Sequence, residues 1–424
     1  MLAAAAAGGA ALLLRSPGPS PVSGPRLAWT AQLPSPDMNV QPVSDTTVLC
    51  VGSPGAACFD LATGKPLWHE SDGSTTAAKG YGGLVYALRT DGKVHALDAR
   101  TGSERWSAYP AGTTVAQLQY ADASLLVVTD RSGTFHAFDA TTGAARWSRA
   151  VDGGQFLTGA TSGGQMVLNA MSSTPGVGDV YTVVSRDTGT PLWTAKGLQE
   201  LYTPPTGDLL YAIDSQENLQ ALAADTGTAR WSRPSGLPAT VARLAGYFGS
   251  LQLQAGTLFC NPDDDTYAAT SNPSSGLLAA FDPATGAPSW QIRGPIGILA
   301  GGYDVTGGTV GYVDKLVHGV DQGTGRLRWT AGAGIGTWQF LGAAGGLLIA
   351  AAGSGRSGTQ QGPGLFGFTP DTGHQAWYQP LTGATGDWAT AKASGALLAS
   401  CAGTLFCLAD TTALNRTGST RSPA

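Results

Sequence analysis

The feature that most constrains this chain is a short motif that recurs along it. Eight segments carry the pattern Ala-x-Asp-x-x-Thr-Gly-x-x-x-Trp or a variant of it, and in all eight the glycine lies four residues before the tryptophan. Neighbouring copies are 38 to 59 residues apart, and their tryptophans are Trp68, Trp106, Trp147, Trp193, Trp231, Trp290, Trp329 and Trp377. A repeat at this period predicts an array of similar units closed or stacked on one another.

Each copy of the motif predicts a β-hairpin. In the copy that ends at Trp106, the alternating segment 94–98 runs into Thr101-Gly102, where glycine supplies the positive φ of a tight turn. Further strand-like segments precede each hairpin, such as residues 84–88, and we expect four short antiparallel strands in every repeat. One such sheet cannot bury both of its faces, so successive sheets must pack face to face and close radially.

This register resembles the tryptophan-docking repeat of the PQQ-like, or quinoprotein-type, β-propellers, and the resemblance covers residues 46–412. It implies an all-β fold, an eight-bladed β-propeller of four-stranded antiparallel blades, in which each tryptophan docks between neighbouring blades. Three copies depart mildly from the pattern, with Ser185, Ala223 and Thr369 in place of the turn Asp.

The ends of the propeller are expected to join. Trp29 lies 39 residues before Trp68 and resembles the docking tryptophan of an orphan outer strand, whereas the last repeat, near residues 397–412, has no tryptophan of its own. Trp29 would complete that last blade and tie the chain ends together. With this composite unit, the repeat count also allows nine blades. We place the propeller at residues 26–415.

The two flanking segments are expected to lie outside the propeller. Residues 1–14 are almost wholly Ala, Gly and Leu, and they are shorter than the roughly 20 apolar residues that a spanning helix needs. They resemble the second half of a transmembrane helix, followed by a stiff Pro-rich linker to residue 25; a disordered leader is the alternative. Residues 416–424 are expected to be a disordered tail.

Five cysteines leave an odd count. Cys50 and Cys58 lie on either side of a turn near Pro54, and Cys401 and Cys407 lie on either side of Thr404. Opposed positions in a hairpin can meet disulfide geometry, and we expect both pairs to form disulfides in an oxidising compartment. Buried, reduced cysteine is the alternative.

Charge and residue spacing argue against several functions. The formal net charge of −5 without a basic cluster disfavours a nucleic-acid surface. His95, His136 and His318 occupy one repeat position, which favours a structural role over a metal site. Enzymes of the resembling family carry an adjacent cysteine pair and a calcium site beside their quinone. No two cysteines are adjacent here, and we expect no enzyme activity, no cofactor and no metal.

The repeats lengthen at three places, about residues 171–178, 254–276 and 353–364. All three would interrupt the connection between the second and third strands of a blade and so share one rim, where variable loops on a rigid scaffold usually bind. Our candidates for ligand contact are Asp263, Asp264, Asp265, Tyr267 and Arg356; a solvated surface loop is the alternative for each.

We therefore expect a non-catalytic, extracytoplasmic propeller, acting as a monomer, that binds an unknown protein or small molecule on the insertion-bearing rim. It is similar to the propeller that follows the membrane helix of actinobacterial serine/threonine kinases, so any membrane contact would be through an N-terminal anchor. One alternative is an envelope assembly scaffold like the outer-membrane lipoprotein propeller, which should show a lipobox cysteine near residue 20; none is present. A quinoprotein dehydrogenase is a further alternative.

Overall fold

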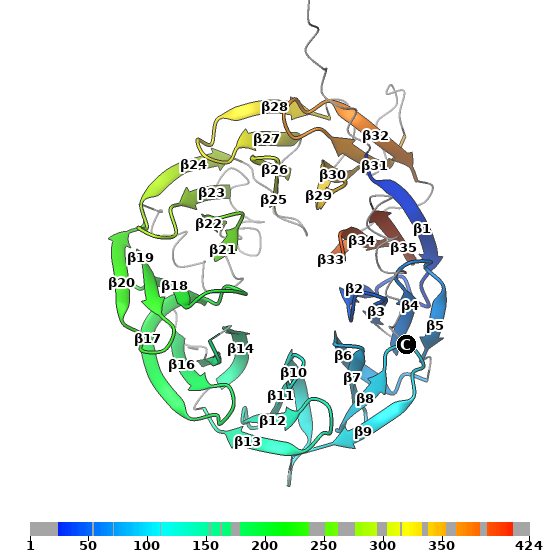
Figure 1. Cartoon of the computed structure of the whole chain (residues 1–424), viewed down its shortest axis with the longest axis vertical. Coiled ribbons are helices and arrows are strands. Elements are labelled where there is room, and N and C mark those ends of the chain that lie inside the picture. Colours follow the sequence, from blue (N-terminus) through cyan, green and yellow to red (C-terminus); the bar gives the residue numbers. More distant parts are fainter. Residues whose placement is uncertain are drawn as a thin grey trace, which may run out of the picture.

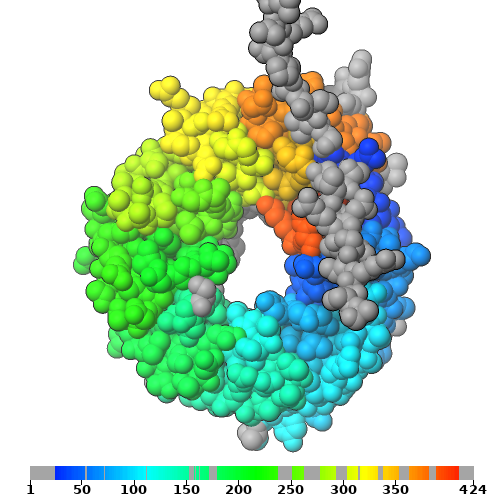
Figure 2. All heavy atoms as spheres, viewed as in Figure 1, coloured from blue at the N-terminus to red at the C-terminus, as the bar shows by residue number. Residues whose placement is uncertain are grey.

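In a computed structural model the chain forms a ring of β-strands around a central opening (Figures 1 and 2). The structure describes residues 24–409 except for 53–54, 71, 111, 152–153, 162, 171–178, 237–250, 262–275, 295–302, 314–315, 333–337, 353–361 and 382–387. These residues form 35 strands and no helix. None of them therefore belongs to a helix with the length and hydrophobicity that crossing a bilayer requires.

The strands recur in groups of four, counted from the central opening outward (Figure 1). The first strands are β2 (Asn39–Pro42), β6 (Thr75–Tyr81), β10 (Val115–Ala121), β14 (Gly154–Ala160), the end of β17 (Pro191–Tyr202), β21 (Leu251–Gln254), β25 (Tyr303–Thr306), β29 (Trp338–Ala344) and β33 (Ala389–Ala393). The second strands are β3 (Thr47–Gly52), β7 (Leu84–Arg89), β11 (Leu125–Asp130), β15 (Gln165–Ala170), β18 (Leu209–Asp214), β22 (Thr257–Cys260), β26 (Thr309–Val313), β30 (Leu347–Ala352) and β34 (Ala396–Cys401).

The outer half of each group holds the hairpin of the sequence motif. The third strands are β4 (Gly55–Asp60), β8 (Val94–Asp98), β12 (Phe135–Asp139), β16 (Asp179–Ser185), β19 (Asn218–Ala223), β23 (Gly276–Phe281), β27 (Val317–Asp321), β31 (Gly364–Phe368) and β35 (Thr404–Ala409). The fourth strands are β5 (Pro66–His69), β9 (Glu104–Ala108), β13 (Ala145–Arg149), the start of β17, β20 (Ala229–Pro234), β24 (Pro288–Gly294), β28 (Leu327–Ala331), β32 (Gln375–Pro380) and β1 (Arg26–Gln32).

Hydrogen bonding joins these strands into eight antiparallel sheets, the number of blades that the family resemblance implies. Seven sheets have four strands, and the eighth has seven, from β14 to β20. In the seven-stranded sheet, β17 pairs with β16 up to Leu198 and with β18 from Leu198 onward. It is thus the outermost strand of one four-strand blade and the innermost strand of the next. Counted as four-strand blades, the described strands make nine, the larger number that the repeats allow.

We number the blades along the chain. Blade 1 holds β33, β34, β35 and β1, blade 2 holds β2 to β5, blade 3 β6 to β9, blade 4 β10 to β13, blade 5 β14 to β17, blade 6 β17 to β20, blade 7 β21 to β24, blade 8 β25 to β28 and blade 9 β29 to β32. The buried apolar residues fall into nine clusters, one between each pair of neighbouring blades. Face-to-face burial therefore runs around the whole ring, as radial closure requires.

Blade 1 contains strands from both chain ends, as the position of Trp29 predicts. β1 pairs antiparallel with β35, from Arg26 opposite Ala409 to Gln32 opposite Thr404. The amide of Leu33 extends this pairing with a 2.8 Å hydrogen bond to the carbonyl of Gly403. The N-terminal strand therefore covers an edge that the C-terminal hairpin would leave open.

Every fourth strand carries a β-bulge at the residue before its motif tryptophan. A bulge adds one unpaired residue and re-aims the side chains beside it. In blades 3, 4 and 8 the bulged residue is an arginine that forms an ion pair with the Asp that begins its own turn: Arg105 with Asp98, Arg146 with Asp139, and Arg328 with Asp321. The motif therefore ties its own hairpin together.

Candidate functional site

The motif tryptophans contact the next blade in a uniform way. Eight of them donate a hydrogen bond from Nε1 to the carbonyl of the residue after the turn-starting position of the next blade, at 2.7–3.2 Å. These pairs are Trp29 with Leu61, Trp68 with Ala99, Trp106 with Ala140, Trp147 with Arg186, Trp193 with Ala224, Trp231 with Pro283, Trp290 with Gln322 and Trp329 with Pro370.

The glycine of each Thr-Gly turn lies against the indole ring. In these eight contacts its φ is between 66° and 73°, and a Cβ added to it would lie 2.4–2.9 Å from a ring atom of the tryptophan. Only glycine satisfies both conditions without strain. Trp377 instead lies beside Gly24, just before β1. A Cβ added to Gly24 would be 3.3 Å from the Cβ of Trp377. These positions therefore serve the scaffold.

The disulfide expectation is wrong, because the hairpin registers differ from those assumed. Cys50 pairs with Ala57, and Cys58 pairs with Leu49, so the two cysteines are one residue out of register and their side chains lie on opposite faces of the sheet. Cys401 pairs with Thr404 and Cys407 with Leu398, so these two are three residues out of register, and their side chains also lie on opposite faces of the sheet. All five cysteines are buried, and none of them forms a disulfide.

Burial also changes the chemistry of these thiols. It raises the pKa of Cys50 and of Cys407 to about 12. The pKa of Cys58 is raised as well, by burial first and by the neighbouring Cys50 second. Because the thiolate is the reactive form of cysteine, these side chains behave as small apolar core residues.

The three equivalent histidines bond across the outer strands of their blades. His95 lies between Glu104 (Nδ1 to Oε2, 2.9 Å) and Asp91 (Nε2 to Oδ2, 3.1 Å). His136 lies between Ser148 and Asp130. His318 contacts Thr330 at 3.1 Å and stacks on Tyr312. Across the part of the chain that the structure describes, no three His, Cys, Asp or Glu side chains gather closely enough to hold a metal ion.

The lengthened connections all join a second strand to a third strand. They link β15 to β16, β22 to β23, and β30 to β31. The ends of these strands lie on one rim of the ring, which we call the insertion rim, and the Thr-Gly turns lie on the other, the turn rim. The second insertion begins after Cys260, since Gln254 and Thr257 are paired across a tight turn. The candidate contacts Asp263, Asp264, Asp265, Tyr267 and Arg356 lie outside the described residues.

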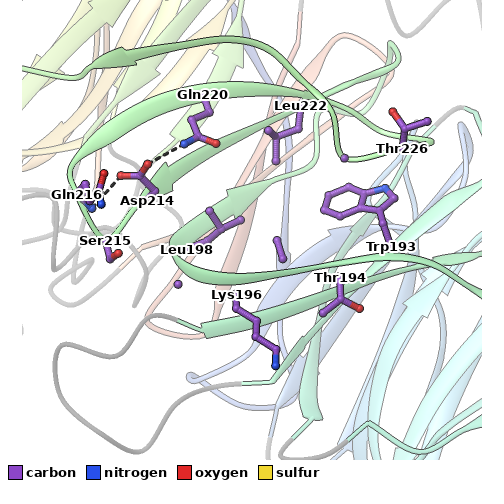
Figure 3. Close-up of a pocket in the computed structure, with 13 residues that line it drawn as sticks. Trp193, Thr194, Lys196, Leu198, Asp214, Ser215, Gln216, Gln220, Leu222 and Thr226 are labelled. Atoms are coloured by element: carbon purple, nitrogen blue, oxygen red, sulfur yellow. Dashed lines mark hydrogen bonds between the residues drawn. The ribbon is translucent and has the colours of Figure 1, made fainter.

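A pocket lies where β17 passes from blade 5 to blade 6 (Figure 3). It measures about 440 Å³ and is lined by Trp193, Thr194, Ala195, Lys196, Gly197, Leu198, Asp214, Ser215, Gln216, Gln220, Leu222, Thr226 and Gly227. We call it the Trp193 pocket. Trp193 and Thr226 lie at one end and the β18–β19 turn, residues 214–217, lies at the other (Figure 3). That turn joins a second strand to a third, so this end belongs to the insertion rim.

The pocket owes its shape to the continuous strand. Gly197 has a φ of +76° in the middle of β17, a left-handed conformation that favours glycine. Its carbonyl accepts a 2.9 Å hydrogen bond from the amide of Ser215. This contact fixes the β18–β19 turn over the pocket end, while Gly197 and Gly227 place no side chain in the space between them.

One end of the pocket is polar, and its single carboxylate there is fully engaged. Asp214 accepts hydrogen bonds at Oδ1 from the amides of Gln216 and Asn218, both 2.9 Å, and at Oδ2 from Gln220 Nε2 at 2.7 Å. The opposite side is apolar, with Leu198 and Leu222 buried and Trp193 half-buried. Lys196 is exposed, and its side chain points away from the apolar residues (Figure 3).

The first insertion leaves and re-enters the fold beside this pocket. Asp179, the first described residue after it, pairs with Leu198, and the following Val180 pairs with Lys196. Asn169 Nδ2 donates a 3.0 Å hydrogen bond to Asp179 Oδ2 and so joins the two strand ends. Sequence patterns did not indicate this pocket: Trp193 and Thr226-Gly227 are part of the repeat motif, but its polar residues 214–216 and Gln220 belong to no motif.

A family model matches the chain over three overlapping stretches, residues 23–119, 90–314 and 274–420, and its description is outer membrane protein assembly factor BamB. Curated protein sequences give no significant match. Among solved structures, the chain is similar to BamB from Moraxella catarrhalis, with 17% identity over 91% of this chain and 98% of that one and a TM-score of 0.53.

Two other solved structures are also similar to the chain. The computationally designed protein Ika8 has 14% identity over 89% of this chain and 98% of that one, with a TM-score of 0.50. Quinohemoprotein alcohol dehydrogenase from Comamonas testosteroni has 13% identity over 95% and 78%, with a TM-score of 0.49. The family match spans nearly the whole ring, from before β1 to beyond β35, and the chain therefore belongs to the BamB family of PQQ-like propeller repeat proteins.

Proposed function

We propose that this chain is a non-catalytic binding propeller that works outside the cytoplasm and holds a partner protein on its insertion rim. One observation carries the proposal: the three lengthened connections and the polar end of the Trp193 pocket share that rim. The turn rim is occupied differently, since its Thr-Gly turns are used in the indole contacts that hold the blades together. The length of the connections therefore varies on the insertion rim, where the contacts between blades do not require equal turns.

The non-catalytic part of the proposal is supported by how reactive side chains are used. His95, His136 and His318 make cross-strand hydrogen bonds in equivalent positions, as scaffold residues do. The thiols of Cys50 and Cys407 are buried with a pKa of about 12, which leaves almost no thiolate at neutral pH.

The family favours one form of this function. Its name, outer membrane protein assembly factor, supports an envelope location and a role as an assembly scaffold that contacts other proteins. The apolar segment 1–14 favours another form, a propeller behind a membrane anchor as in the sensor part of a serine/threonine kinase. Both forms require a partner on the rim, and the same experiment addresses both.

Photo-crosslinking from single positions in the native organism tests the proposal. Benzoylphenylalanine is placed at Gln216 on the insertion rim and, as the matched control, at Thr324 in a Thr-Gly turn on the opposite rim; both are exposed. We expect a discrete protein adduct from Gln216 and none from Thr324. Adducts from Thr324 alone, or from neither position, would contradict the proposal.

A further inference from the structure

The Trp193 pocket has a chemistry that goes beyond protein binding on the rim. Its volume of about 440 Å³ falls within the roughly 300–1,000 Å³ range of small-molecule sites. Gly197 and Gly227 place no side chain in the space, and two hydrogen bonds frame it: one from the amide of Ser215 to the carbonyl of Gly197, and one from Trp193 Nε1 to the carbonyl of Ala224. The site is therefore preformed in the scaffold.

The charges around the pocket indicate a neutral ligand. The carboxylate of Asp214 is engaged by two backbone amides and by the side chain of Gln220. The side chain of Lys196 points away from the apolar residues of the pocket, Leu198, Leu222 and Trp193 (Figure 3). An anionic ligand group at the polar end would lie beside the carboxylate of Asp214, and a cationic group would compete with the donors that this carboxylate already binds, so a neutral polar group fits this end best.

The polar and apolar surfaces lie on different sides of the space. Leu198, Leu222 and Trp193 supply an apolar wall, and Ser215, Gln216 and Gln220 bring a hydroxyl and two carboxamides to one end (Figure 3). A matching ligand has one flat apolar face and several neutral hydrogen-bonding groups at its edge. Aromatic rings favour such a face, because the C–H groups of the ligand carry the positive charge that the ring face attracts.

Gln220 places a carboxamide at a repeat position that holds histidine in three other blades. The equivalent positions in blades 3, 4 and 8 are His95, His136 and His318, and each bonds to its own fourth strand. Gln220 Nε2 donates to Asp214 Oδ2 on the neighbouring turn, which is the contact that His136 Nε2 makes with Asp130 Oδ2 in blade 4. Its carboxamide is thereby held at the pocket end, with Oε1 available as an acceptor.

We propose that the Trp193 pocket binds the neutral pyranose ring of a sugar, with the C–H face of the ring on Trp193 and Leu222 and its hydroxyls on Gln216 and Gln220. A pyranose presents its apolar face and its polar edge in this arrangement. The ligand could be a free sugar or one ring of a glycan chain, and both place the same chemistry in the pocket.

Saturation-transfer NMR and calorimetry on the full chain test this proposal with glucose, N-acetylglucosamine, cellotriose and N,N′-diacetylchitobiose as probes. We expect binding of at least one probe with a dissociation constant of about 1 mM or tighter. Binding of a monosaccharide identifies a free sugar or chain end as the ligand source, whereas binding of the oligosaccharides alone identifies a chain.

Two variants and a control keep the test specific. Gln220→Ala should weaken binding of the active probe about five- to tenfold, as expected for one lost hydrogen bond, and Ser215→Trp should abolish binding by filling the exposed end. Gln117→Ala is the control: it removes an exposed carboxamide from β10, a first strand beside the central opening. It should change neither sugar binding nor the melting temperature. The proposal is overturned if no probe binds at about 10 mM, or if Ser215→Trp and Gln220→Ala bind like the wild type. Neither result would affect the rim crosslinks from Gln216.

Discussion

The indole contact between blades can be separated from the cost of a left-handed backbone by two glycine substitutions. Gly143 has a φ of +73°, and a Cβ there would lie 2.6 Å from Cε3 of Trp106. Gly256 has a φ of +78°, and a Cβ there would meet no atom within 4 Å. Gly143→Ala and Gly256→Ala therefore share the same backbone strain, and only the first disturbs a tryptophan.

The magnitudes follow from this geometry. A left-handed alanine costs about 1–2 kcal/mol, and loss of glycine flexibility in the unfolded chain offsets about 0.4–1 kcal/mol of that, so Gly256→Ala should destabilise the protein by at most about 1.6 kcal/mol. At Gly143, the indole must shift by about 1 Å to restore normal carbon contacts, and such overpacking costs about 1–3 kcal/mol. The 3.2 Å hydrogen bond from Trp106 to Ala140 would also be lost, adding about 1 kcal/mol.

Thermal unfolding measures the difference. For a chain of this size, each kcal/mol should lower the melting temperature by about 1–2 °C, so the extra cost of about 2–4 kcal/mol should make Gly143→Ala melt about 2–8 °C below Gly256→Ala. Near-ultraviolet circular dichroism should change only in the first variant, because only there does an indole move. If both variants melt together, the contact between indole and turn does not stabilise the ring, and the reasoning from repeat glycines fails.

Three further outcomes are expected. Deleting residues 1–23 should leave the melting temperature unchanged, whereas deleting 1–34 removes β1 and should destabilise the ring and cause association through the open edge of β35, seen by size-exclusion chromatography; a monomer that melts like the shorter deletion would show that β1 does not close the ring. All five thiols should react with a thiol reagent only after denaturation, because the buried Cys50 and Cys407 have a pKa of about 12; rapid reaction of the native protein would contradict this. Titration with PQQ and calcium should give no stoichiometric complex, and micromolar binding would overturn the non-catalytic proposal.

The parts of the fold that sequence could predict are those set by local physics. The Thr-Gly turn needs a positive φ and the tryptophan lies at a fixed distance from it, so each motif marks a third and a fourth strand wherever it occurs. Trp29 carried the same signal and predicted ring closure through β1. These inferences needed no knowledge of the pairing partner.

The cysteine pairing failed because it depended on register, which is a longer-range property. Two residues placed symmetrically about a turn lie opposite each other only if the centre of the turn has been located to within a single residue. A shift of one residue moves a side chain to the other face of the sheet. In the hairpin of Cys50 and Cys58 the error was one residue, and in that of Cys401 and Cys407 the turn centre lies before Gly403 and not at Thr404. The bulge in each fourth strand could not be predicted from the sequence either, because it does not change the spacing between the glycine and the tryptophan of the motif.

The Trp193 pocket was missed for a related reason. Trp193 and Trp231 are 38 residues apart, as are Trp68 and Trp106, yet the two intervals are divided differently. Between blades 2 and 3 the chain leaves β5 at His69 and enters β6 at Thr75, so a connection separates the two blades. Between blades 5 and 6, β17 continues without a break to Tyr202, and the longer connection is residues 203–208, between β17 and β18. Equal repeat length therefore conceals a different strand plan. The one local signal is Pro204-Pro205, which cannot extend a paired strand and places the strand end before it. The pocket lies where one repeat divides its residues between strands and connections differently from the others. Comparing repeat lengths does not show this difference, whereas comparing strand boundaries does.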